Sequence, residues 1–227
     1  MKRLNGLLIL GIFSIGFQIP AQAGQTDLRQ ELTFHLLLSE KKCQMAIWLS
    51  DEKNTFVDTI YVTQKVAQKG LGNRSGELDD KWGGPRLSVL PVWAHHRGID
   101  YGGGNYYPTK EKPLVDAMTS ATPDAGEFIR SWKPEKPLKS GKYNYHIEVN
   151  KSFDKNPHHD YSWYRGQPSV VWTGSILISE KPSESEPKLV GHGHVAGADG
   201  KINPDISTLT TALQLIKKAK VIYRPVP

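Results

Sequence analysis

Short runs of apolar residues, some of them alternating with polar ones, recur along the chain and are typical of β-strands. The expected strands cover residues 32–36, 45–49, 56–62, 127–132, 142–149, 170–178, 188–195 and 220–223. The polar residues 50–54 have turn chemistry and separate the second strand from the third. We therefore expect the first three strands to form an antiparallel meander.

One helical pattern accompanies these strands. Ile206, Leu209, Leu213 and Ile216 fall on a single helical face and predict one short helix near the C-terminus. Seven or eight strands with one short helix are typical of a mainly β protein. We predict a β-sandwich of immunoglobulin-like type, without the paired cysteines of antibody domains.

Residues 64–114 interrupt the strand pattern with Gly-rich and aromatic segments, such as residues 101–107. A loop region of this length in a compact domain is usually functional or contains an unrecognised element. Leu87, Leu90 and Trp93 have helical spacing and favour a short helix within residues 86–97. Pro91 counts against that helix.

The N-terminus has the order of a secretory signal peptide over residues 1–23. Lys2 and Arg3 precede the apolar run 7–17, and Ala21-Gln22-Ala23 supplies a small-residue cleavage site before Gly24. The apolar run is shorter than the roughly 20 residues that a membrane span needs. We expect residues 24–227 to form one exported, periplasmic domain without a membrane span.

The charge and the cysteine content reduce the number of functions that the protein can have. The formal net charge is +6, and loss of the signal peptide lowers it, because Lys2 and Arg3 are removed. Such a charge, without a basic block or helix, argues against a nucleic-acid partner. Cys43 is the only cysteine and cannot form an internal disulfide. Since it adjoins an apolar strand, we expect it to be a small core residue and not a nucleophile.

Residues 116–122 carry the clearest chemical pattern in the chain. They resemble the acceptor motif of exported flavoproteins, Asp-x-x-Ser/Thr-Gly-Ala-Thr, through Asp116, Thr119, Ala121 and Thr122, and Ser120 stands where that motif prefers Gly. The resemblance implies that an exported transferase joins the phosphate of flavin mononucleotide (FMN) to the Thr122 hydroxyl. The same residue types are common in turns, where Asp116 would bond its own backbone.

A wider resemblance extends over nearly the whole of the expected mature chain. Similarity to the predicted periplasmic proteins grouped as domain of unknown function 2271 is carried by Glu148 and by residues 45–48, 90–93, 116–123 and 140–143. Members of that family occur beside flavin transferases and membrane proteins with PepSY domains. The resemblance implies a flavin-linked electron-transfer role outside the cytoplasm, either as the flavin carrier or as a partner of one.

Aromatic residues between positions 64 and 114 offer faces on which a flavin ring can stack: Trp93, Tyr101, Tyr106 and Tyr107. Simple packing explains these residues equally well. No Gly-x-Ser-x-Gly elbow, phosphate-binding loop or Cys-x-x-Cys pair occurs in the chain. We therefore do not expect the protein itself to turn over a substrate.

A metal site is a second possibility. His192 and His194 lie on an expected strand, where residues two apart point to the same face. Neutral imidazoles are common metal ligands, and the pairs His95-His96 and His158-His159 lie in loops that can approach them. Local hydrogen bonding of these histidines is the simpler interpretation, because no His-Glu-x-x-His pattern accompanies them.

The alternative to a flavin-linked role is a function of a different kind, a cofactor-free binding module for a metal, a glycan or an envelope protein. Aromatic residues of a β-sandwich can line such a surface. The candidates are Trp82, Tyr161, Trp163, Tyr164 and Trp172. Trp172, like Trp48, lies in an apolar strand and fits a core position as well.

Overall fold

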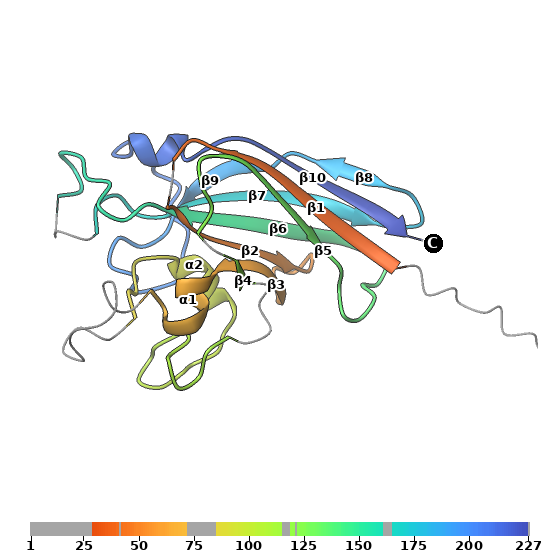
Figure 1. The fold of residues 1–227 in the computed structure, drawn as a ribbon, viewed down its shortest axis with the longest axis horizontal. Coiled ribbons are helices and arrows are strands. Elements are labelled where there is room, and N and C mark those ends of the chain that lie inside the picture. Colours follow the sequence, from red (N-terminus) through yellow and green to blue (C-terminus); the bar gives the residue numbers. More distant parts are fainter. Residues whose placement is uncertain are drawn as a thin grey trace, which may run out of the picture.

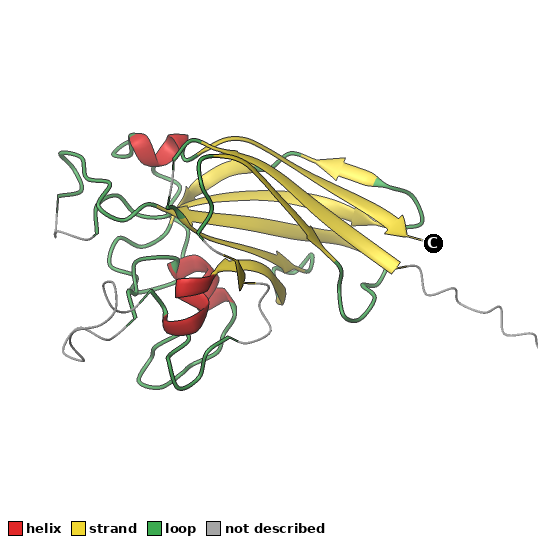
Figure 2. Ribbon diagram, in the orientation of Figure 1, coloured by secondary structure: helices red, strands yellow, loops and turns green. Residues whose placement is uncertain are grey.

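Two β-sheets packed face to face form the body of the protein, as a computed structural model shows (Figure 1). The structure describes residues 29–40, 42–71, 85–114, 119–120, 122–160 and 165–226. Strands dominate and the helices are short (Figure 2), which confirms the predicted mainly β sandwich. The expected signal peptide lies outside the described residues.

The smaller sheet has four antiparallel strands in the order β5-β1-β10-β8. Their bounds are Gly126–Trp132 (β5), Arg29–Leu38 (β1), Ile216–Val226 (β10) and Ser183–Ser185 (β8). The predicted meander is correct for the second and third strands, which pair antiparallel, and wrong for β1, which does not pair with the second. β1 pairs with strands distant in sequence, because its alternating pattern specifies a buried face but not the partner that hydrogen-bonds to its edges.

The larger sheet has six strands in the order β4-β3-β2-β6-β7-β9. Their bounds are Thr119–Ser120 (β4), Phe56–Thr63 (β3), Gln44–Ser50 (β2), Gly141–Asn150 (β6), Val170–Ile178 (β7) and Lys188–His192 (β9). All neighbours are antiparallel except β3 and β4, which are parallel. β4 and β9 are the edge strands of this sheet.

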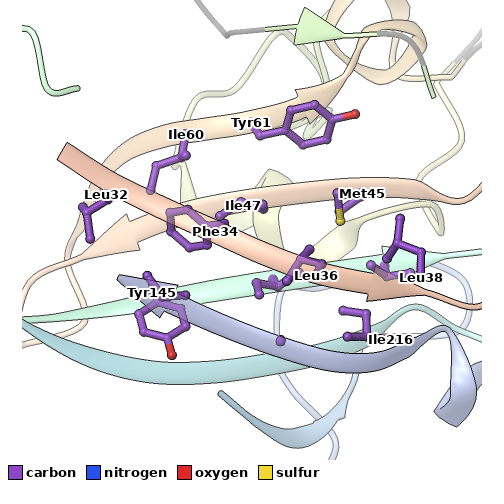
Figure 3. Packing of buried hydrophobic residues seen from close by; sticks show 14 of the residues in the cluster. Leu32, Phe34, Leu36, Leu38, Met45, Ile47, Ile60, Tyr61, Tyr145 and Ile216 are labelled. Carbon is purple, nitrogen blue, oxygen red and sulfur yellow. The ribbon is translucent and has the colours of Figure 1, made fainter. Parts of the chain in front are cut away.

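The main hydrophobic core lies between the two sheets (Figure 3). Alternate residues of β1, such as Phe34 and Leu36, meet Met45 and Ile47 of β2 there. Cys43 belongs to the same core, and its burial raises the pKa of its thiol to about 11. That position agrees with a small core residue, since a nucleophilic cysteine needs a lowered thiol pKa.

A second core covers the opposite face of the six-stranded sheet. Every residue of β2 is buried, and Ala46 and Trp48 point away from the sandwich into a cluster with Trp93 and Tyr107. The helices α1 (Gln64–Lys69) and α2 (Pro91–His96) lie on this side, next to β2 and β3 (Figure 1). Burial on both faces explains why the apolar run at 45–49 is continuous and does not alternate.

Both expected helices have bounds that differ from the sequence pattern. α2 begins at Pro91, in the first turn, where the missing N–H of proline costs no helical hydrogen bond. The C-terminal helix is a single 3₁₀ turn, Thr211–Gln214, because β10 already begins at Ile216. No helix among the described residues has the length and apolar character required to cross a membrane.

Candidate functional site

The end of the 116–122 segment lies at the edge of the six-stranded sheet. β4 pairs with Val62 and Thr63 of β3, and no other strand among the described residues pairs with it. Asp116 and Ala121 lie outside the described residues, and only the backbone of Thr119 and Ser120 is described. Beyond β4, the Pro123 carbonyl accepts a hydrogen bond from the Lys42 N–H at 3.3 Å. This bond places Pro123 beside the residues that lead into β2.

Thr122 has the exposure that an acceptor residue needs. Its side chain is half-buried, and its hydroxyl makes no hydrogen bond with any residue in the described part of the chain. An edge strand has unpaired backbone groups on one side, which other proteins can approach. Thr122 therefore keeps part of its side-chain surface exposed beside an edge strand.

The four aromatic candidates for sheltering a flavin ring divide into two pairs. Trp93 and Tyr107 are completely buried in the second core, so their faces are not accessible to a ligand. Tyr101 and Tyr106 are half-buried, and they contact Arg97 and His95 respectively. Of the four, only Tyr101 and Tyr106 therefore keep ring surface that a ligand could contact.

A buried carboxylate, Glu148 of β6, joins α2 to the sheet. Its oxygens accept the N–H groups of Val92 and Trp93 at 3.2 and 2.8 Å, and the Ser169 hydroxyl at 2.6 Å. Burial raises the pKa of Glu148 to about 7. These three hydrogen bonds satisfy the group and hold the first turn of α2 against the sheet. Residues 90–93 and Glu148, far apart in sequence, therefore meet in one place.

Beside Glu148, α2 and the sheet enclose a cleft of about 570 Å³, which we call the histidine cleft. It is lined by Trp48, Asn54, Val92, His95, His96, His146, Gly200, Lys201 and Ile202. His146, at its floor, stacks on Trp48 with 4.9 Å between ring centroids. Hydrogen bonds join its two ring nitrogens to Ser50 and Thr173. Burial, with His96 nearby, lowers the pKa of His146 to about 4, so this imidazole is neutral near pH 7.

The two histidines of α2 have defined ring orientations. The indole N–H of Trp48 donates to His96 Nδ1 at 2.7 Å, so the proton of His96 is on Nε2, which donates to the Asn54 carbonyl at 2.7 Å. His95 donates its Nδ1–H to the Pro91 carbonyl at 2.9 Å. Its Nε2 has no hydrogen-bond partner among the described residues and is left as an acceptor.

The suggested metal ligands His192 and His194 do not share one strand. β9 ends at His192, whose Nδ1–H donates to the Gly193 carbonyl at 2.7 Å. His194 accepts the backbone N–H groups of Ala196 and Ala198 through Nδ1. Across the part of the chain that the structure describes, no group of three or more His, Cys, Asp or Glu residues is arranged to hold a metal ion. In both histidines, Nδ1 therefore makes local hydrogen bonds with nearby backbone groups.

The aromatic surface suggested for a glycan or peptide falls mostly outside the described residues, because Trp82, Tyr161, Trp163 and Tyr164 are not among them. Trp172 is partly buried and packs against the main core, and its buried indole N–H has no hydrogen-bond partner in the described part of the chain. Trp48 is completely buried, as its apolar strand predicts.

Comparison of the chain with models of protein families, with curated proteins and with solved structures found no match. The assignment of a function therefore depends on the two places described above, the Thr122 segment and the histidine cleft. Sequence reasoning did not find the cleft. The available signal was the pair His146 and Glu148, two polar residues on one face of a strand that contains the apolar residues Tyr145, Ile147 and Val149.

Proposed function

We propose that this protein carries FMN on Thr122 and serves an exported, flavin-linked electron-transfer system in the periplasm. The observation that carries the proposal is the coincidence of the acceptor-like sequence with an edge position. Thr122 follows the edge strand β4, is half-buried, and has no described hydrogen-bond partner for its hydroxyl. Its proposed partners are a flavin transferase, which attaches the cofactor, and a membrane redox protein, which exchanges electrons with it.

The attachment is a transfer of FMN from a flavin adenine dinucleotide. The Thr122 oxygen attacks the phosphorus of the FMN half, and the bond between that phosphorus and the bridging oxygen breaks. AMP leaves with the bridging oxygen, and the hydroxyl proton passes to a base of the transferase. The product is a phosphodiester that joins Thr122 to FMN. The flavin supplies the electron-carrying chemistry when bound, and this chain supplies its anchor.

We also propose that the chain belongs to the family grouped as domain of unknown function 2271. Two of the sequence segments that carry the resemblance lie together in the second core, where Trp48 and Trp93 are both buried. Glu148, which also carries it, binds the N–H groups of Val92 and Trp93. A common structural role for these residues, in holding α2 on the sheet, supports the proposal.

Intact-mass analysis tests the flavin proposal directly. The full chain, co-expressed with an exported flavin transferase, is expected to gain the mass of one FMN less one water, and Thr122→Ala is expected to gain none. Thr122→Ser is the matched variant, since it keeps a hydroxyl at the same position and should still accept flavin. An unmodified wild-type chain, in cells where the transferase modifies another acceptor protein, contradicts the proposal.

A further inference from the structure

The histidine cleft is separate from the proposed flavin attachment point. The Pro123 carbonyl, next to Thr122, accepts a hydrogen bond from Lys42, two residues before β2. The cleft lies around Trp48 and Asn54, towards the other end of that strand. Lys42 and Trp48 are six positions apart, which corresponds to about 20 Å of extended chain. What binds in the cleft is therefore a separate question from whether Thr122 carries a flavin.

Three polar groups that line the cleft have free hydrogen-bonding capacity. His95 Nε2 is the first. The second is the side-chain amide of Asn54, whose oxygen accepts the Ser50 hydroxyl at 3.4 Å and whose NH₂ has no described partner. The third is the ammonium of Lys201, an exposed residue that forms no ion pair with any described residue. Asp199, two residues before Lys201, accepts the Lys201 backbone N–H and does not line the cleft.

The charge of the lining favours an anion. None of the nine described lining residues is Asp or Glu, and Lys201 is the only lining residue with a fixed charge. A cation at the rim of a cleft whose lining holds no carboxylate attracts an anionic ligand. The Lys201 ammonium and the Asn54 amide are both hydrogen-bond donors, which suits the two oxygens of a carboxylate.

The rest of the lining consists mainly of aromatic rings and aliphatic side chains. The His95 ring packs against Tyr106 at 4.4 Å between centroids, and a Cβ at Gly200 would come within 2.5 Å of the His95 Cβ. Ile202 and Val92 supply aliphatic surface. Planar imidazoles and aliphatic side chains are good contacts for an aromatic ring. The volume of about 570 Å³ is within the range of about 300–1,000 Å³ that is usual for small-molecule sites.

We propose that the histidine cleft is a binding site for a small aromatic carboxylate. The carboxylate binds to the Lys201 ammonium and the Asn54 amide, and the ring lies against Ile202 and the imidazoles of α2. A hydroxyl or amino group on the ring would donate to His95 Nε2. This inference does not depend on the proposed flavin attachment.

The test uses benzoate as the probe and the full chain as the protein. Benzoate, titrated by isothermal calorimetry and by NMR of the Trp indole N–H groups, is expected to bind saturably and to shift the Trp48 signal, because that N–H bonds to His96 at the cleft. Lys201→Gln is expected to raise the Kd about tenfold, the usual effect of losing one charge-assisted hydrogen bond. Lys188→Gln, which removes an exposed lysine from β9, should leave the Kd unchanged.

A second variant tests the amide. Asn54 has a φ of +62°, so Asn54→Gly keeps the left-handed backbone and the carbonyl that accepts from His96, and removes only the side chain. It is expected to weaken benzoate binding severalfold. Thr122→Ala should bind benzoate as the wild type does, which separates the two proposals. The inference is overturned if benzoate does not bind at millimolar concentration, if benzyl alcohol binds as tightly, or if Lys201→Gln and Asn54→Gly both keep the wild-type Kd.

Discussion

At the scale of single residues, Glu148 makes the stability of the fold depend on pH. Its pKa is about 7 in the folded protein, against 4.5 for an ordinary glutamate, so the folded state binds the proton more tightly. Its contribution is therefore complete below pH 4.5 and is lost as the pH rises through 7, by about 3 kcal/mol in total. His146 acts in the opposite direction, since its lowered pKa makes the fold less stable as the pH falls from 6.5 to 4.

Glu148→Gln isolates the first effect. The variant has no titrating group at this position. Its free energy of unfolding should therefore increase relative to that of the wild type as the pH rises from 4.5 to 7.5. Urea denaturation at several pH values measures this difference. Glu127→Gln, which replaces an exposed glutamate of β5, is the control and should follow the wild-type profile. A constant difference between Glu148→Gln and the wild type over this range would refute the assignment.

At the scale of elements, a glycine-containing loop holds the α2 region in place. A Cβ at Gly193 would collide with Pro91 and Ser169, and one at Gly197 would overlap the Leu87 carbonyl. Gly197→Ala is therefore expected to cost about 2 kcal/mol more than Gly98→Ala, because overpacking adds to the same left-handed strain. The two glycines have φ values of +72° and +68°, but nothing lies within 4 Å of a Cβ at Gly98. Urea denaturation of both variants checks the prediction, and equal losses would contradict it.

The strands and helices also show how much of the structure could be predicted from the sequence. Most strands lie where apolar patterns predict them, because each strand's own residues decide its burial. Their partners do not follow, since β1 pairs with β5 and β10, which come much later in the chain. For the same reason the Thr122 segment, a continuous motif, could be predicted as a candidate site. The histidine cleft could not, because α2, β6 and residues 200–202 meet there only after the sheet has formed.

At the scale of the whole molecule, two hydrophobic cores share one sheet. β2 is buried on both faces, with Ile47 in the core between the sheets and Trp48 in the core beneath the helices. Loss of either core exposes a face of this strand, so we expect the two cores to unfold together. The described chain should therefore behave as one cooperative unit, although its sandwich and its helical layer have different architectures.

Trp93→Ala tests that coupling from the helical side. Trp93 is completely buried and donates its indole N–H to Thr59, so its removal is expected to cost about 3–5 kcal/mol. Phe34→Ala, in the core between the sheets, is the matched variant with a similar expected loss. In both variants the far-UV and near-UV circular dichroism signals should fall in a single transition at a lower Tm. Two separated transitions in Trp93→Ala, with the strand signal lost at the wild-type Tm, would mean that the helical layer unfolds alone. In that case β2 does not couple the cores, and the histidine cleft could open without loss of the sandwich.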